Sequence, residues 1–227
     1  MSLKKIFFKS KLSYKVYLYY NLYIRHKGFL KREKYSQWGE DKFIAEYFKD
    51  KDKGIYLDIG CFNPFMYSNT CLLHKKGWSG INIDINPTSI DLFNIARPRD
   101  INICAAISDK EENVKVNIEN IFSPLNTISL NRSKKLNSKS IKKNSYYVKS
   151  QKINKIVKNK FDFLNIDIEG LDIKVLKSIK LNFYKPKLIC IEILNSKKFH
   201  SLKKYLNKQN YVYIRKMGPS YLFRLKG

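Results

Sequence analysis

Five short apolar runs, each with an acidic residue at or near its end, constrain the fold of this chain more than any other sequence feature. The runs alternate with segments whose apolar residues have helical spacing. Strands that are apolar along almost their whole length are buried on both faces, as in a parallel sheet covered by helices. The sequence therefore predicts a doubly wound, mostly parallel α/β sheet. The expected strands are Ile55–Ile59, Gly80–Asp84, Ile101–Ile107, Phe161–Asp167 and Lys187–Leu194.

The rest of the chain is predicted to complete one domain over residues 36–227, preceded by a basic, aromatic, helical arm over residues 1–35. A polar stretch at 123–147 is typical of a long loop, an insertion or a lid. A C-terminal antiparallel hairpin, Tyr211–Arg215 with Tyr221–Leu225, is expected at the sheet edge. The expected helices are residues 4–24, 43–48, Tyr67–Lys76, Pro87–Ile95, Leu171–Ser178 and Lys197–Leu206, and Val114–Ile118 is an expected short extra strand.

The net charge of +26 comes mainly from two segments. Residues 1–35 contain ten Lys or Arg and one acid, and residues 131–160 contain eleven Lys or Arg and no acid. Both segments fit a solvated, lysine-biased surface, and both fit a surface that attracts an anionic partner. Only seven of the 45 basic residues are Arg. Because specific phosphate and base-edge contacts favour arginine, this lysine excess is a weak argument against sequence-specific reading of a nucleic acid.

No segment has the length of a transmembrane helix or the pattern of a signal peptide. The longest apolar candidate, residues 16–24, is shorter than the roughly 20 residues that a membrane span requires. The four cysteines lack metal-site spacing, and we expect Cys61 and Cys104 to be buried structural thiols in a cytoplasmic protein. The arm over residues 1–35 would suit peripheral contact with a membrane surface or a partner, although docking on its own domain is the commoner outcome. Nothing in the sequence specifies an oligomeric state.

In a doubly wound sheet, ligands bind outside the carboxyl ends of the strands. Asp84 ends the second expected strand, 26 residues after Asp58, where an acid can accept hydrogen bonds from ribose hydroxyls. Gly60 allows close backbone approach, but the glycines that make room for a diphosphate are absent. This combination favours a nucleoside without a diphosphate, such as S-adenosylmethionine. Asp58 could instead be a carboxylate that fixes a loop or caps a helix.

The fourth expected strand ends in two acids that could act on a substrate. Asp167 and Glu169 are two residues apart, so in an extended chain both side chains face the same way. An alcohol acceptor needs a base or a Lewis-acid metal to remove its proton. We expect Asp167 and Glu169 to be catalytic, and with Glu192 they could form an all-oxygen site for a divalent cation such as Mg²⁺. Alternatively, Glu169 makes a turn and Asp172 serves the following helix. We expect His74, Trp38 and Trp78 to be packing residues.

Several ordered motifs resemble the FkbM family of S-adenosylmethionine-dependent methyltransferases. The resemblance spans Ser36 to Glu192, most of the chain. The later glycines of the wider superfamily's loop are replaced by Phe62 and Pro64, in agreement with the FkbM pattern. The motifs are YSQWGED at 35–41, YLDIGCFNP at 56–64, YSNT at 67–70, GWSG at 77–80, NIDINP at 82–87, RPRD at 97–100, FLNIDIEGLD at 163–172 and PKLICIE at 186–192.

The resemblance implies a class I methyltransferase domain of the Rossmann-like type. It implies that Asp58 and Gly60 line the methionine end of the cofactor and that Asp84 holds the ribose. Ser108 and Asp109 would lie beside the adenine. Two further family positions, Gln37 and Asn69, would close over the cofactor.

The family's acceptors imply O-methylation of a sugar or glycan hydroxyl, on a nucleotide-linked or lipid-linked intermediate of polysaccharide biosynthesis. The basic segment 131–160 would then act as a lid that attracts an anionic acceptor. Two alternatives stay open. One is an RNA methyltransferase that uses both basic segments, and the other is a non-catalytic protein that binds the cofactor or docks on a membrane.

Overall fold

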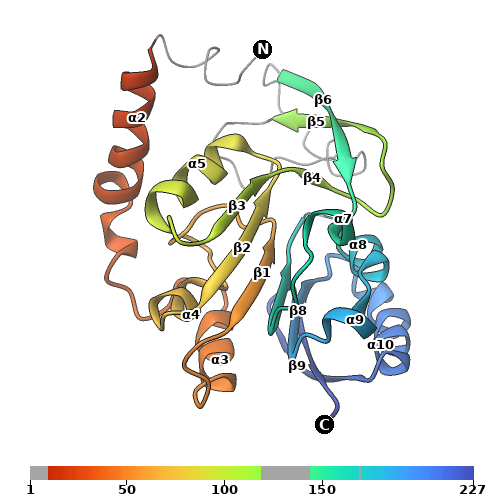
Figure 1. The fold of residues 1–227 in the computed structure, drawn as a ribbon. Helices are drawn as coiled ribbons and strands as arrows, with labels where there is room; N and C mark the ends of the chain where they lie inside the picture. Colours follow the sequence, from red (N-terminus) through yellow and green to blue (C-terminus); the bar gives the residue numbers. More distant parts are fainter. Residues whose placement is uncertain (1–9, 119–143, 169) are drawn as a thin grey trace.

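A seven-stranded sheet forms the centre of the protein (Figure 1). The structure is a computed structural model that describes residues 10–118, 144–168 and 170–227. The strand order is β3-β2-β1-β7-β8-β10-β9. The strands are β1 (Ile55–Ile59), β2 (Ser79–Asp84), β3 (Ile101–Cys104), β7 (Phe163–Ile166), β8 (Leu188–Glu192), β9 (Tyr211–Met217) and β10 (Ser220–Leu225).

The topology confirms the predicted doubly wound sheet. β1, β2 and β3 follow one another outward in one direction, while β7 and β8 extend the sheet on the other side of β1. All pairs among these five strands are parallel, and β10 is antiparallel to both β8 and β9. The strand order therefore reverses between β1 and β7, which is where ligands bind in such sheets. The C-terminal antiparallel hairpin is also confirmed.

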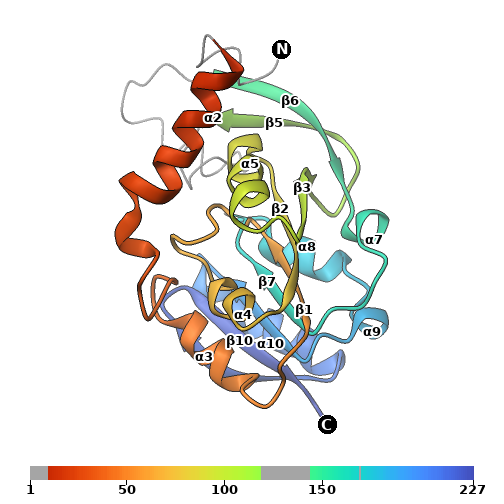
Figure 2. The same ribbon diagram turned by 60° about the vertical axis from the view of Figure 1, so that its left-hand side comes forward.

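Helices cover both faces of the sheet, as the apolar strands require (Figures 1 and 2). Side chains alternate along β1, so Leu57 and Ile59 pack in one core cluster and Tyr56 packs in another. The first cluster includes residues of α8 (Asp172–Ser178), α9 (Leu181–Tyr184) and α10 (Phe199–Lys208). The second cluster includes residues of α3 (Glu40–Tyr47) and α4 (Cys71–Lys75), while α5 (Pro87–Ala96) packs beside them on β2 and β3.

The expected strand Ile101–Ile107 is divided between two sheets. β3 stays in the main sheet, whereas β4 (Ala106–Ile107) pairs in parallel with β6 (Asn144–Gln151) in a small sheet. β6 also pairs antiparallel with β5 (Asn113–Ile118), the predicted extra strand. Residues 144–147, expected at the end of a polar insertion, are thus part of a strand. The rest of the expected insertion, residues 123–143, lies outside the described residues.

The N-terminal arm docks on the domain. It consists of α2 (Lys11–Tyr19), a π-helical segment η1 (Tyr20–Arg25) and a 3₁₀ turn η2 (Lys27–Phe29), so the predicted helix is confirmed from Lys11 onward; residues 4–9 lie outside the described residues. Tyr14, Leu18 and Leu22 pack with Leu92 of α5 in a core cluster. Among the described residues, no helix has the length and apolar character needed to cross a membrane.

Smaller sequence expectations have mixed outcomes. Trp78 is buried, as predicted, whereas Trp38 is 57% exposed and lies close to Gly218. His74 is a packing residue, with Nδ1 3.6 Å from Asp100 Oδ2. The expectation of a buried Cys104 was wrong, because it lies at the end of edge strand β3, where its thiol is exposed. The predicted helix Tyr67–Lys76 is shortened to α4, since the chain turns with positive φ angles at Phe62 and Tyr67.

A buried arginine ties this turning segment to the sheet. Arg97 follows α5 and its side chain is completely buried. Its Nη1 donates hydrogen bonds to the hydroxyls of Tyr56 (3.0 Å) and Thr70 (2.9 Å). Its Nη2 donates to the Ser68 hydroxyl (3.0 Å) and to the carbonyl of Pro64. One guanidinium group therefore fixes β1 and three points of the loop between β1 and α4.

Two carboxylates balance the charge of Arg97 through those hydroxyl groups. Tyr56 donates to Asp100 Oδ2 (2.5 Å), and Thr70 donates to Asp58 Oδ2 (2.8 Å). Burial alone would lower the pKa of Arg97, but Tyr56, Cys71 and the two carboxylates outweigh it and raise the pKa. Arg97 is therefore a charged residue in the interior, held by a connected polar network.

Replacing Arg97 should destabilise the fold strongly. Arg97→Leu leaves the buried hydroxyls and carboxylates of the network without their cation, so we expect the free energy of unfolding to fall by about 3–5 kcal/mol. Urea denaturation followed by circular dichroism measures this. Arg99→Leu, at an exposed position two residues away, is the matched control and should change stability by less than about 0.5 kcal/mol. Equal effects of the two substitutions would contradict this account of the network.

Candidate functional site

The parallel register brings the predicted site residues to one edge of the sheet. Ile59 of β1 pairs with Ile83 of β2 and with Ile166 of β7, and Ile166 pairs with Ile191 of β8. The residues that follow these positions are therefore level with one another at the carboxyl edge. They are Gly60, Asp84, Asp167 and Glu192.

Gly60 lies in close contact with the end of β7. Its φ angle is +85°, and a Cβ atom placed there would lie 1.8 Å from the carbonyl oxygen of Asp167. The Gly60 amide donates to the carbonyl of Ile83 (2.8 Å), so the chain stays joined to β2 as it leaves β1. Only glycine satisfies both the positive φ angle and the lack of space.

Asp84 holds the two loops on either side of it. Its Oδ2 accepts a hydrogen bond from the Phe62 amide (2.9 Å), and its Oδ1 accepts one from the Asn86 amide (2.7 Å). The side chain is half-buried, and burial raises its pKa to about 6 even though the backbone amides lower it. Asp84 is thus a fixed, partly accessible carboxylate at the switch point of the sheet, with lone pairs available for further hydroxyl donors.

Asp58 lies beneath this edge and is fully buried. Both of its carboxylate oxygens accept hydrogen bonds from side chains, Oδ2 from Thr70 and Oδ1 from Asn165 (2.8 Å each). Asn165 in turn accepts from Asn69 Nδ2 (2.9 Å). Burial raises the pKa of Asp58, while these donors oppose the rise. In this structure Asp58 therefore orients Asn165, through which it is linked to the half-buried Asn69.

Gln37 is exposed in a tight turn that is anchored next to the same edge. Asp41 accepts from the Ser36 hydroxyl (2.6 Å), and Glu40 accepts from the Trp38 amide (2.9 Å). Glu40 also accepts from the hydroxyl of Ser220 (2.9 Å), which is the register partner of Glu192 in the β10–β8 pair. The SQWGED motif is therefore a turn attached to the end of β8, with Gln37 presented to solvent.

Ser108 and Asp109 are held by the small sheet instead of the main one. Ser108 follows β4, and its amide donates to the carbonyl of Gln151 in β6 (3.1 Å). The Ser108 hydroxyl donates to Asp109 Oδ1 (3.1 Å). Because the chain leaves the main sheet after Cys104, these two residues are offset from the line of strand ends formed by Asp84, Asp167 and Glu192.

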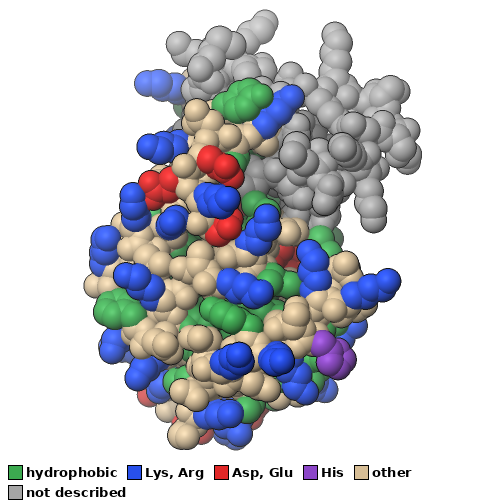
Figure 3. Space-filling view, turned by 90° about the vertical axis from the view of Figure 1, so that its right-hand side faces the viewer, with side chains coloured by type: hydrophobic (Ala, Val, Ile, Leu, Met, Phe, Trp, Pro, Cys, Tyr) green, Lys and Arg blue, Asp and Glu red, His purple; other side chains and the backbone are tan. Residues whose placement is uncertain are grey.

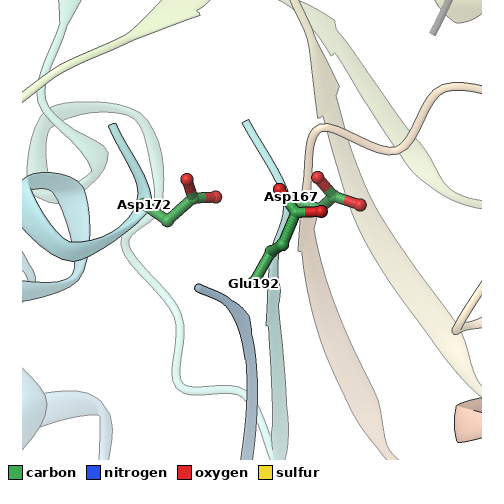
Figure 4. A group of neighbouring side chains, drawn as sticks. All are labelled: Asp167, Asp172 and Glu192. Carbon is green, nitrogen blue, oxygen red and sulfur yellow. The ribbon is translucent and has the colours of Figure 1, made fainter. Parts of the chain in front are cut away.

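Three carboxylates from three elements lie together at the ends of β7 and β8 (Figure 4). Asp167, Asp172 and Glu192 each have a carboxylate oxygen within 4.8 Å of the others. Asp167 is exposed and Glu192 is half-buried, and their carboxylates lie beside each other in Figure 4. Asp172 is buried, and its oxygens accept hydrogen bonds from the amides of Ile168 and Gly170 (2.8 Å each).

Asp167 and Glu192 form a hydrogen-bonded carboxylate pair. Dense packing around the carboxyl group raises the pKa of Asp167 well above its ordinary value, and the negative charges of Glu192 and Asp172 raise it further. A hydrogen bond to Glu192 has the same effect. Two carboxylates this close disfavour ionisation of both at once, so Asp167 accepts a proton more readily than an isolated aspartate does. A carboxylate that readily accepts a proton meets one requirement for a general base.

The expected partner of Asp167, Glu169, lies outside the described residues. Among the described residues, the third carboxylate of the cluster is that of Asp172, which the alternative interpretation of the sequence gave to the following helix. That assignment was incomplete, because Asp172 begins α8 and at the same time holds the loop that follows Asp167. Local pattern did not signal this contact, because an Asp at the start of a helix usually binds backbone amides that follow it, whereas Asp172 binds two that precede it.

A cavity of about 130 Å³ lies between the N-terminal arm and the start of α5. Sequence reasoning missed it, because it forms only where the arm docks. Asn21 on its wall is 1% exposed, and its Nδ2 has no hydrogen-bond partner. Arg25 and His26 add further donors, and the pKa of His26 is lowered by burial and by Arg25. The lining residues are Asn21, Arg25, His26, Phe62, Asn63, Met66, Thr88, Ser89 and Leu92.

Comparison with known proteins identifies the family. The model of the methyltransferase FkbM domain matches residues 58–213, well over half of the chain. The chain belongs to the FkbM methyltransferase family. A comparison with curated proteins finds no match.

One solved structure supports the fold. The methyltransferase FkbM from Methylobacillus flagellatus KT has 15% sequence identity to this chain and a TM-score of 0.51. The alignment covers 76% of this chain and 44% of that one, so this FkbM chain spans less than half the length of its structural relative.

The family implies S-adenosylmethionine as cofactor, and the chemistry of the strand ends fits it. Asp84 offers a fixed carboxylate to a pair of hydroxyl groups, as ribose recognition requires. Gly60 has no side chain, so a ligand can approach the backbone closely at the switch point. The loop after it lacks the further glycines of a diphosphate site. These observations match a nucleoside ligand without a diphosphate.

Adding a methyl group at Gly60 should disrupt this edge. Gly60→Ala forces a left-handed conformation on a residue with a side chain, which costs about 1–2 kcal/mol, and the overlap with the Asp167 carbonyl adds to that. We expect a lower free energy of unfolding in urea denaturation and a weaker affinity for S-adenosylmethionine in calorimetry. Gly28→Ala is the matched control, because no atom lies within 4 Å of the added Cβ. Cofactor affinity unchanged by Gly60→Ala would rule out this edge as the cofactor site.

Proposed function

We infer that this protein is an S-adenosylmethionine-dependent O-methyltransferase that acts on a hydroxyl group of a sugar or glycan intermediate. The observation that carries the inference is the pairing of Asp167 with Glu192 at the same sheet edge as Asp84 and Gly60. A carboxylate able to accept a proton thus lies next to the position expected for the cofactor. Family membership supports methyl transfer, and the all-oxygen chemistry of the pair supports a hydroxyl acceptor.

The residues proposed to hold the cofactor are those of the strand ends and of the loops beside them. Asp84 would accept hydrogen bonds from the ribose hydroxyls. Gly60 and Asp58 would shape the methionine end, with Asp58 acting through Asn165 and Asn69, to which it is linked. The remaining candidates are Gln37, which would close over the cofactor, and Ser108 with Asp109, which would lie beside the adenine.

The reaction needs an acceptor hydroxyl in line with the transferred methyl group and a route for its proton. Bound S-adenosylmethionine supplies the activated methyl group. Asp167 would take the proton from the acceptor hydroxyl as the methyl group passes from the sulfur of the cofactor to the acceptor oxygen, with the carbon–sulfur bond breaking as the carbon–oxygen bond forms. Glu192, whose charge and hydrogen bond raise the pKa of Asp167, would favour this proton uptake.

The acceptor proposed here carries an anionic group, such as the phosphate of a nucleotide-linked or lipid-linked sugar. The cavity beside the arm supports this, because its polar lining is rich in hydrogen-bond donors. Arg25 supplies positive charge, and Asn21 supplies a buried amide without a partner. The cavity also borders Phe62, whose amide binds Asp84, so it adjoins the cofactor region. The basic segment 131–160 could assist as a lid, although residues 131–143 lie outside the described residues.

A divalent cation is a further part of the proposal. Asp167, Asp172 and Glu192 present oxygen ligands of the kind that Mg²⁺ prefers. The two backbone hydrogen bonds of Asp172 reduce what that residue can offer. A cation there would act as a Lewis acid toward the acceptor hydroxyl. All four cysteines are free thiols, which fits the cytoplasmic location that we propose for the reaction.

Cofactor binding should depend on the ionisation of Asp84. An ionised carboxylate accepts stronger hydrogen bonds than a protonated one, so affinity falls as the pH is lowered through the pKa of about 6. We expect S-adenosylmethionine to bind about tenfold more weakly at pH 5 than at pH 7 in calorimetry. Asp84→Asn should bind weakly at both values and lose this dependence. A wild-type affinity that stays constant over that range would contradict the role of Asp84.

A methyl-transfer assay with labelled cofactor tests the function. The acceptors are a panel of nucleotide-linked and lipid-linked sugars and an RNA, each with and without a chelator. We expect transfer to a sugar, and a loss of about 10²–10⁴-fold in turnover in Asp167→Asn with cofactor affinity preserved. Asp52→Asn, an exposed aspartate before β1, is the matched control and should retain activity.

The other outcomes are equally informative. Transfer to RNA alone would overturn the sugar acceptor, and full activity of Asp167→Asn would overturn the assigned base. Activity that the chelator abolishes and Mg²⁺ restores would place a cation at the acidic cluster. Cofactor binding without transfer to any acceptor would favour a non-catalytic protein.

A further inference from the structure

The N-terminal arm has two apolar faces, and among the described residues only one of them packs against the rest of the domain. The inner face packs on α5 through Tyr14, Leu18 and Leu22. A helix that merely docks on its domain has a polar outer face. Here the outer face is also apolar and aromatic. Its exposed side chains are Leu12, Val16, Tyr19, Tyr20, Tyr23 and Ile24.

Four of these exposed side chains lie along one side of the arm. Leu12, Val16, Tyr19 and Tyr23 follow one another at helical spacing of i, i+4, i+7 and i+11, so they lie on the same side of the helix. Leu12 is 72% exposed and Val16 is 61% exposed, values unusual for aliphatic side chains that lie next to each other. Contiguous exposed apolar surface of this kind marks an interaction site.

Basic residues surround this surface, and acids are absent from it. Lys11, Lys15, Arg25 and Lys27 are exposed on the arm, and the first acid in the chain is Glu33. Aliphatic side chains, several tyrosines and flanking lysines are the combination found on helices that lie in a membrane interface. The tyrosine rings have an apolar body and a polar tip, which suits the boundary between headgroups and acyl chains.

We propose that the outer face of α2 and η1 docks on the surface of an anionic lipid bilayer. Leu12, Val16 and Ile24 enter the headgroup region, while Lys11 and Lys15 contact lipid phosphates. RNA would pair with the lysines but leave the aliphatic side chains in water. A second copy of the chain would bring two sets of basic residues together with no acid on the arm before Glu33 to pair with them.

Among residues 10–118, 144–168 and 170–227, no element packs on the outer face of the arm. In Figures 1 and 2, α2 lies at the periphery with α5 on its inner side. Tyr14 donates to Asp91 in α5 (2.8 Å), so the arm is fixed beside the helix that follows Asp84. The side of the molecule that carries α10 also has Lys and Arg, spread over its surface (Figure 3). Positive charge is therefore present on more than one side of the molecule, and the apolar face of the arm is the feature that determines which side docks on the membrane. This inference does not depend on the proposed function.

Flotation of the full-length protein with lipid vesicles tests the proposal. We expect binding to vesicles of phosphatidylcholine with phosphatidylglycerol and little binding to phosphatidylcholine alone. Leu12→Ser with Val16→Ser should reduce the partition coefficient about tenfold or more. Lys11→Glu with Lys15→Glu should reduce it by at least about 25-fold, at about fivefold for each lysine lost, and the effect should shrink at high salt.

Matched variants separate the arm from the rest of the surface. Ile101→Ser with Phe183→Ser removes two exposed apolar side chains elsewhere, and Lys204→Glu with Lys208→Glu makes the same charge change on α10. Both controls should bind vesicles as the wild type does. All the substituted side chains are exposed, and circular dichroism with cofactor calorimetry verifies that each variant is folded.

Three results would overturn the proposal. The first is a wild-type protein that does not bind anionic vesicles. The second is an equal loss of vesicle binding in the arm variants and the control variants. The third is a wild-type dimer, in light scattering without lipid, that Leu12→Ser with Val16→Ser converts to a monomer, because the face would then be a contact between copies.

Discussion

The guanidinium group of Arg97 holds together the part of the molecule on which the candidate site is built. A buried cation is strongly unfavourable unless nearby groups compensate it. Here the compensation is indirect, since hydroxyl groups of Tyr56 and Thr70 stand between Arg97 and the carboxylates of Asp100 and Asp58. The same guanidinium fixes the loop after β1, so the position of that loop depends on a single planar group with several donors.

This network divides the sheet into two chemically different faces. Alternation along β1 places Tyr56 and Asp58 on the side of α3 and α4, while Leu57 and Ile59 enter the purely apolar core with α8 and α10. On the polar side, most of the hydrogen bonds of Arg97, Asp100 and Asp58 are made with neighbouring side chains of the same network. The carboxylates left partly accessible are those at the very ends of the strands, where a cofactor and an acceptor can meet them. The arm then adds a cavity beside this edge and an unused apolar face outside it.

Much of the fold was predictable because apolar strands have a strong local signature. The five parallel strands, most of the helices and the terminal hairpin follow from periodicity and length. β6 could not be predicted, since a strand in a small sheet needs no continuous apolar run, and its sequence is polar. The burial of Cys104 was predicted wrongly because the sequence does not show which strand is the edge. Asp172 was assigned only to its helix, although its carboxylate also holds the loop after Asp167.

The sequence by itself determined that acids would stand at the carboxyl ends of buried parallel strands, because both the strands and the acids are local features. It also determined that the first 32 residues would be basic and free of acid. Only the tertiary structure decided how these features meet. The register of β7 and β8 brought Asp167 beside Glu192. The carboxylate of Asp58 accepts hydrogen bonds from Thr70 and Asn165 inside the protein. Docking of the arm buried one of its two apolar faces against α5, and the side chains of the other face are exposed. Such pairings depend on contacts between distant segments, which local patterns do not encode.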